Sequence, residues 1–115
     1  MTKALLATLV VLALTGPACG GGGGTDCTSG NAIKLTGTLT VKNSAFSPSC
    51  FSVTSGAAIS VTNSDPRGHN FTVRGTDVAV VVLPRETGEA TAPGPGTYDF
   101  LCTIHPGMKG TIIVT

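Results

Sequence analysis

Four residues with metal-binding side chains lie in a close pattern. Cys102, His105 and Met108 follow one another at intervals of three residues, as Cys-x2-His-x2-Met. His69 is the only other histidine, and Met108 is the only methionine besides Met1. One thiolate, two imidazoles and one thioether form the donor set of a blue-copper site. These residues therefore predict a mononuclear copper site suited to one-electron transfer.

The surrounding sequence predicts how the fold delivers these ligands. Residues 96–102 alternate as a strand does, so Cys102 is expected at the end of the face that points into the core. A Pro-Gly turn then leads back past His105 into a final β-branched strand at residues 111–114. A strand, a short loop and a second strand make a rigid mount, to which another part of the fold must bring His69.

The middle of the chain has the pattern of short strands separated by turns. Apolar and polar residues alternate in residues 33–41, 51–53, 59–61 and 71–73. Residues 78–83 form a continuous apolar run rich in valine, which predicts a strand buried on both faces. Residues 63–68 form a loop on turn chemistry, and no segment has a helical period. We expect an all-β antiparallel sandwich of seven to eight strands.

With these residues the chain resembles the cupredoxins, a family of small blue-copper proteins, from about residue 34 to residue 115. Its short ligand loop is similar to those of amicyanin and pseudoazurin. The resemblance implies a Greek-key β-sandwich that holds one copper ion near one end. It also implies a trigonal ligand set of His69, Cys102 and His105, with Met108 as the weak axial ligand.

Residues beside the ligands also match the family pattern. The resemblance implies that Asn70 and Thr103 hydrogen-bond the two ligand loops together and donate to the thiolate, which orients and tunes the metal site. Gly68, just before His69, looks more like azurin. Whether the carbonyl of Gly68 approaches the copper stays open.

The resemblance implies an electron-transfer protein rather than an enzyme. The edge of His105 would serve as the electron port, where a donor and an acceptor protein dock on a monomer. The net charge is only +1 and the basic residues are scattered, so no stripe for nucleic acid is expected. There are no paired carboxylates near a motif, and no nucleophile lies beside a base, which leaves little support for an enzyme.

Two other functions stay open. The same ligands could serve an exported copper carrier or store, although delivery sites favour exposed, methionine-rich clusters, which this sequence lacks. Cysteine and histidine also bind zinc, so the chain could be a structural zinc-binding β-domain. Structural zinc sites, however, rarely use methionine.

The N-terminal sequence predicts export from the cytoplasm. Residues 1–18 have a basic start, an apolar core too short to span a membrane, and small residues before Cys19, as in a signal peptide. Cys19 resembles the lipidated cysteine of bacterial lipoproteins, although Gly16 stands where leucine is usual, so ordinary cleavage stays open. Residues 19–31 would form a glycine-rich tether to the domain at 32–115. We expect a periplasmic or cell-envelope protein, anchored through Cys19.

The cysteines divide among three roles. If Cys19 carries lipid and Cys102 binds copper, then Cys27 and Cys50 remain, and an exported protein can form a disulfide between them. Closing a loop of this size stabilises a fold by roughly 3 kcal/mol in the chain-entropy model. Two free buried thiols, or a bridge between Cys19 and Cys27, stay open.

Overall fold

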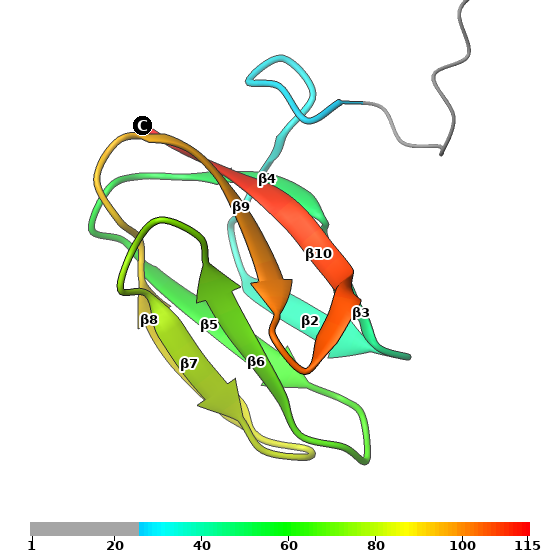
Figure 1. The fold of residues 1–115 in the computed structure, drawn as a ribbon. Helices are drawn as coiled ribbons and strands as arrows, with labels where there is room; N and C mark the ends of the chain where they lie inside the picture. Colours follow the sequence, from blue (N-terminus) through cyan, green and yellow to red (C-terminus); the bar gives the residue numbers. More distant parts are fainter. Residues whose placement is uncertain (1–25) are drawn as a thin grey trace, which may run out of the picture.

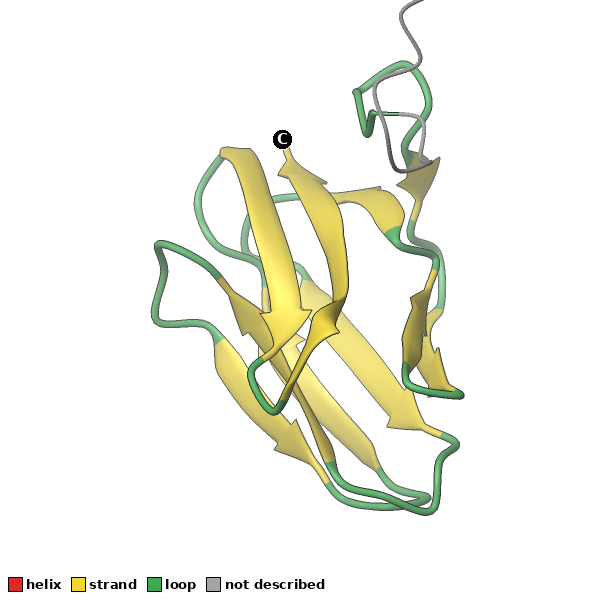
Figure 2. Cartoon of the chain, turned by 45° about the vertical axis from the view of Figure 1, so that its right-hand side comes forward, coloured by secondary structure: helices red, strands yellow, loops and turns green. Residues whose placement is uncertain are grey.

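The computed structural model describes residues 26–115, which form a sandwich of two β-sheets without a helix among them (Figures 1 and 2). The ten strands are β1 (Ile33–Lys34), β2 (Thr38–Lys42), β3 (Ala45–Ser47), β4 (Cys50–Val53), β5 (Ala58–Asn63), β6 (His69–Val73), β7 (Ala79–Val82), β8 (Thr87–Thr91), β9 (Gly96–Cys102) and β10 (His105–Val114). The predicted all-β sandwich is confirmed, with ten strands where seven to eight were expected.

Each sheet mixes antiparallel and parallel pairs. The larger sheet has the order β1-β4-β10-β9-β6-β7 and the smaller one the order β3-β2-β5-β8. The pairs β1–β4, β4–β10 and β2–β5 are parallel, and the other pairs are antiparallel. The sheets are therefore mixed rather than purely antiparallel, because the chain crosses repeatedly from one sheet to the other.

A cluster of aromatic rings fills the core next to the predicted ligand strand. Phe100 on β9 is fully buried, and its ring centroid lies 5.0 Å from that of Phe46, 5.2 Å from Phe71 and 5.4 Å from Phe51. Such pairs add about 0.5–1.5 kcal/mol each beyond the burial of their area. Since Phe100 and Cys102 share one face of β9, this packing fixes the strand that ends at Cys102.

Two of the strand predictions were wrong in detail. The alternating segment 33–41 is divided between β1 and β2, which belong to different sheets. The apolar run 78–83 was expected to be buried on both faces, but β7 is an edge strand, in which Val81 is 71% exposed while Val82 is 1% exposed. Continuous apolar character does not distinguish an edge strand from a central one.

A glycine lets β8 cover the side of β7. A Cβ atom at Gly88 would lie only 3.1 Å from the Val80 side chain and 3.2 Å from that of Val82. The edge strands of the two sheets can therefore approach each other closely there. Covering an edge in this way protects it from pairing with other chains.

The predicted disulfide between Cys27 and Cys50 is present, and it ties residues 26–31 to the start of β4. Asn31 closes this segment as a turn, with its side-chain oxygen 2.7 Å from the backbone nitrogen of Thr28. The predicted signal peptide, Cys19 and the glycine tract lie outside the described residues. Within residues 26–115, no helix is long and apolar enough to cross a membrane.

Candidate metal centre

Three neighbouring strands bring the predicted ligands to one end of the larger sheet. His69 begins β6, Cys102 ends β9 and His105 begins β10. Because β9 is antiparallel to both β6 and β10, its end lies beside their beginnings. His69 and Cys102 are buried, with exposed fractions of 2% and 0%, whereas His105 is half-buried.

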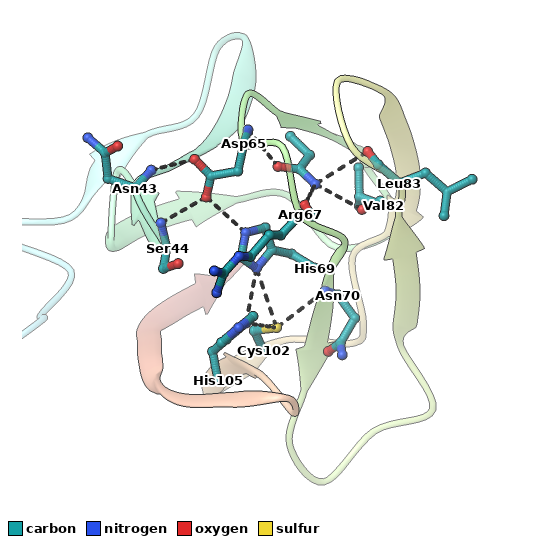
Figure 3. Close-up of polar contacts among 11 residues, drawn as sticks. Asn43, Ser44, Asp65, Arg67, His69, Asn70, Val82, Leu83, Cys102 and His105 are labelled. Carbon is teal, nitrogen blue, oxygen red and sulfur yellow. Dashed lines mark hydrogen bonds and ion pairs between the residues drawn. The ribbon is translucent and has the colours of Figure 1, made fainter.

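The donor atoms of these three residues face one another (Figure 3). The Nδ1 atoms of His69 and His105 are 3.2 Å apart, and the Sγ atom of Cys102 lies 3.9 Å from the first and 3.7 Å from the second. Ligands that share a metal at bond lengths of about 2.0–2.3 Å must lie within about 4.5 Å of each other. The three residues therefore form a cluster that can hold a metal ion.

Met108, the predicted axial ligand, is buried. It is 3% exposed and belongs to the same core cluster as Cys102. The pairing of β9 with β10 shifts register between His105 and Lys109, and this irregularity gives the loop room before the regular strand resumes. The strand then needs Gly110, because a Cβ atom there would overlap the Ser49 carbonyl oxygen and the Phe100 ring.

Hydrogen bonds join the loop that follows Cys102 to the strand that begins at His69. The Asn70 side chain donates to Thr103 Oγ1 at 2.8 Å and accepts from the Thr103 backbone nitrogen at 3.1 Å. The Asn70 backbone nitrogen donates to Cys102 Sγ at 3.4 Å, which stabilises a thiolate. The hydrogen bonds between Asn70 and Thr103 join the two segments, and the role of both residues at a metal stays a prediction.

Asp65 is a buried partner of His69 that the sequence reasoning did not predict. One of its carboxylate oxygens, Oδ2, lies 2.8 Å from His69 Nε2, on the opposite side of the ring from Cys102 (Figure 3). The carboxylate also accepts from the backbone nitrogens of Asn43 at 2.7 Å and Ser44 at 2.8 Å. The N–H of Ser44, then those of Asn43 and the His69 ring, outweigh the effect of burial and hold the pKa of Asp65 below its ordinary value.

Asn63 fixes the loop that carries Asp65. Its side-chain oxygen accepts from the Asp65 backbone nitrogen at 2.9 Å, and its amide donates to the carbonyls of Arg67 at 2.7 Å and Val82 at 3.0 Å. Asn63 is 1% exposed. The sequence marked residues 63–68 only as a loop. The pattern Asn63-x-Asp65 just before His69 was the available signal. It does not reveal the distant partners of these two side chains, which are the N–H groups of Asn43 and Ser44 and the carbonyl of Val82.

Gly68 lies between this loop and His69, directly before β6. It is half-buried, and a Cβ atom there would meet nothing within 4 Å. A side chain would have room at this position, so crowding does not explain the glycine. A role for the Gly68 carbonyl at the metal stays a prediction.

The donor set fits one type 1 copper ion. Two imidazole nitrogens and a cysteine sulfur converge, and the buried thioether of Met108 belongs to the same hydrophobic core as Cys102. Soft sulfur donors together with imidazoles select copper, and a weak axial thioether distinguishes blue-copper sites from structural zinc sites. Asp65 is committed to His69 and to two backbone N–H groups, so its carboxylate completes the surroundings of the site rather than the donor set.

Comparisons with known proteins bear on the fold and the family. The chain is 34% identical over 68 residues to amicyanin-alpha of Methylorubrum extorquens, a match that covers 54% of this chain and 57% of that relative. A reduced Cu(I) form, at pH 4, of an amicyanin point mutant has a TM-score of 0.59 and 24% identity, over 74% of this chain and 83% of that one. A second amicyanin mutant with Cu(I) has a TM-score of 0.59 and 22% identity, over 73% and 82%.

The two solved structures show a shared fold, and the match to amicyanin-alpha spans little more than half of either protein. The model of the cupredoxin-like domain family matches residues 4–114, nearly the whole chain. The chain therefore belongs to the family of cupredoxin-like domains.

Proposed function

We propose that this protein carries single electrons between redox partners outside the cytoplasm, through one type 1 copper ion. The observation that carries the proposal is the convergence of two Nδ1 atoms and one Sγ atom within 3.9 Å of each other at the end of a rigid sandwich. A bound copper ion would supply the one-electron couple between Cu(II) and Cu(I). His69, Cys102 and His105 would hold it, with Met108 as the axial ligand.

The role of the chain in this proposal is to keep the donor atoms in place. Cys102 is held by core packing of its strand, and His69 by a hydrogen bond on the far side of its ring. Donors that are already positioned need little rearrangement when the charge of the site changes, which lowers the barrier to electron transfer. The buried positions of Cys102 and Met108 also limit access of water.

The path for the electron leads through His105. Its half-buried ring lies at the rim of the site, between the buried Cys102 and the exposed residues Ile104, Pro106 and Gly107. Ile104 is 62% exposed, which gives this rim an apolar character. An uncharged apolar rim suits a transient partner, which must dock and leave quickly.

Export is part of the same proposal. The Cys27–Cys50 disulfide is typical of an oxidising compartment and supports the signal peptide predicted at residues 1–18. We propose that Cys19 is the lipidated N-terminus of the mature chain. In that case Cys19→Ala should move the protein from the membrane fraction to the soluble fraction of the host envelope. An unchanged distribution would contradict the anchor.

Redox cycling in the presence of a Cu(I) chelator tests the function. The copper-loaded domain is reduced with ascorbate, held with the chelator, and reoxidised, while copper is measured in the protein and in the chelator. An electron carrier keeps its copper through repeated cycles and shows a reversible one-electron wave. Transfer of copper to the chelator on each reduction would instead identify a copper carrier.

A further inference from the structure

The ring of His69 has hydrogen-bond partners on both of its nitrogens. Nδ1 faces Cys102 Sγ and His105 Nδ1, while Nε2 faces Asp65 Oδ2 at 2.8 Å (Figure 3). The His69 side chain is 1% exposed and that of Asp65 is 10% exposed, so bulk water competes little for this contact. A carboxylate can only accept a hydrogen bond. The neutral ring must therefore carry its proton on Nε2, which leaves the lone pair on Nδ1 for a metal.

The Asp65 carboxylate is itself held in a fixed orientation. Its oxygens accept from the backbone nitrogens of Asn43 and Ser44, in the turn between β2 and β3. Both turn residues have left-handed backbone conformations, with φ values of 52° and 54°, as in the two-residue turns of β-hairpins. This turn belongs to the smaller sheet, whereas His69 begins a strand of the larger one. Asp65 thus connects the two sheets at the candidate site.

The backbone of Asp65 is fixed as well. The Asn63 side chain accepts from its N–H, and the next residue back, Ser64, donates its N–H to the Val41 carbonyl at 2.8 Å. The contact between Asp65 and His69 is therefore set by several buried hydrogen bonds rather than by a mobile side chain.

The second histidine has no comparable support. Within residues 26–115, the hydrogen bonds of the His105 ring are those of Nδ1 with His69 and Cys102, and Nε2 has none. The two predicted imidazole ligands therefore differ. Asp65 sets the proton position of His69, whereas within the described residues the ring of His105 contacts only the other two candidate ligands.

We infer that Asp65 is a positioning residue for His69, which fixes the proton on Nε2 and places a negative charge beside this imidazole. The position of the proton on Nε2 follows from the geometry alone. The effect of the negative charge on a bound copper ion rests on the proposed copper function. A carboxylate hydrogen-bonded to a ligand makes the imidazole a stronger donor and stabilises the more positive, oxidised state. Asp65 therefore lowers the reduction potential relative to a neutral residue at the same position.

The metal-free wild-type protein tests the predicted proton position on His69 without any substitution. Long-range proton–nitrogen NMR spectra, at a pH at which the rings are neutral, distinguish a proton on Nδ1 from one on Nε2. We expect His69 to be a single tautomer with its proton on Nε2. A His69 ring with its proton on Nδ1, or averaged between the two nitrogens, would overturn the inference.

Asp65→Asn tests the charge, with Asp77→Asn as the matched control. Asp77 is exposed in the turn between β6 and β7, at the far end of β6 from His69, so this variant loses the same charge away from the site. We expect the potential of Asp65→Asn to rise by the equivalent of at least a tenfold change in the redox equilibrium, about 59 mV for one electron. We expect Asp77→Asn to match the wild type.

Equal potentials for Asp65→Asn and the wild type, or equal shifts in the two variants, would overturn the charge effect. If Asp65→Asn does not fold, the tautomer of wild-type His69 still decides the positioning role. If the wild type binds no copper, the proposed function fails, while the tautomer measurement still tests the role of Asp65.

Discussion

The two halves of the candidate site are built in different ways. His69 is buried, and a chain of hydrogen bonds through Asp65 and Asn63 secures it from behind with contacts to both sheets. The segment from Cys102 to Met108 is a short hairpin loop, whose buried ends carry a half-buried histidine between exposed residues. We call His69, Asp65 and Asn63 the wall of the site, because hydrogen bonds to both sheets fix them. We call residues 102–108 the loop of the site.

The two halves of the site therefore have different structural requirements. The wall must not move when the charge of the metal changes, because it sets the position of one donor for both oxidation states. In the proposed function, the loop would supply the remaining donors and also the surface through which a partner reaches the site. Substitutions in the wall should therefore affect stability first, and those in the loop should affect the metal first.

The largest effect is expected in the loop. Cys102→Ser removes the only free thiol within residues 26–115, since Cys27 and Cys50 are joined in a disulfide. We expect the intense blue absorption to disappear completely, while the metal-free protein keeps its fold. Absorption and circular dichroism spectra measure both. A blue band in this variant would contradict the proposed ligand set.

The next effect is expected in the wall. Asn63→Ala leaves the carbonyls of Arg67 and Val82 and the N–H of Asp65 without their partner. Each buried group left unsatisfied costs about 1–3 kcal/mol. We expect the free energy of unfolding of the metal-free, disulfide-intact protein to fall by at least about 2 kcal/mol in urea titrations.

Asn70→Ala is the matched control for Asn63→Ala. Its side-chain hydrogen bonds with Thr103 lie at an exposed position, where water can replace them. We expect a smaller loss than for Asn63→Ala, because an exposed group that loses its partner bonds to water and does not carry the penalty of about 1–3 kcal/mol for a buried unsatisfied group. Equal losses for the two variants would remove the distinction between wall and loop.

A smaller effect is expected from the buried end of the loop. Met108→Gln replaces the thioether with a harder oxygen donor, which favours the oxidised state. We expect copper to stay bound and the reduction potential to fall by the equivalent of at least a tenfold change, about 59 mV. Voltammetry measures the shift, and an unchanged potential would count against an axial role for Met108.

The smallest effect is expected from the exposed rim. Ile104 is 62% exposed, so Ile104→Ser should change the free energy of unfolding by less than about 0.5 kcal/mol. The reduction potential should also stay unchanged. If the rim docks a partner, only the rate of electron exchange with that partner should fall. A loss of stability would show that the loop is part of the rigid wall.

The sequence predicted the loop half of the site better than the wall. Cys102, His105 and Met108 lie within seven residues, so their chemistry and spacing are visible without the fold. The partners of Asp65 are backbone groups more than twenty residues earlier in the chain, and any residue could supply them. A hydrogen bond from a distant backbone N–H leaves no pattern in the sequence.

The same limit applies to the fold. Alternation and turn residues were enough to predict an all-β sandwich, because they report the local conformation. The apolar run at residues 78–83 could not show that β7 lies at an edge, since the order of strands depends on contacts between distant segments. The Cys27–Cys50 disulfide was predictable because other roles were predicted for Cys19 and Cys102, and because the predicted export allows the remaining two cysteines to pair.

The visible absorption spectrum of the disulfide-intact domain, titrated with Cu(II) and then reduced with ascorbate, tests the central claim most directly. We predict an intense blue band that saturates at one copper per chain, bleaches on reduction and returns on oxidation. A colourless protein, or one that takes up zinc instead and shows no redox change, would contradict the assignment of His69, Cys102, His105 and Met108 to a type 1 copper site.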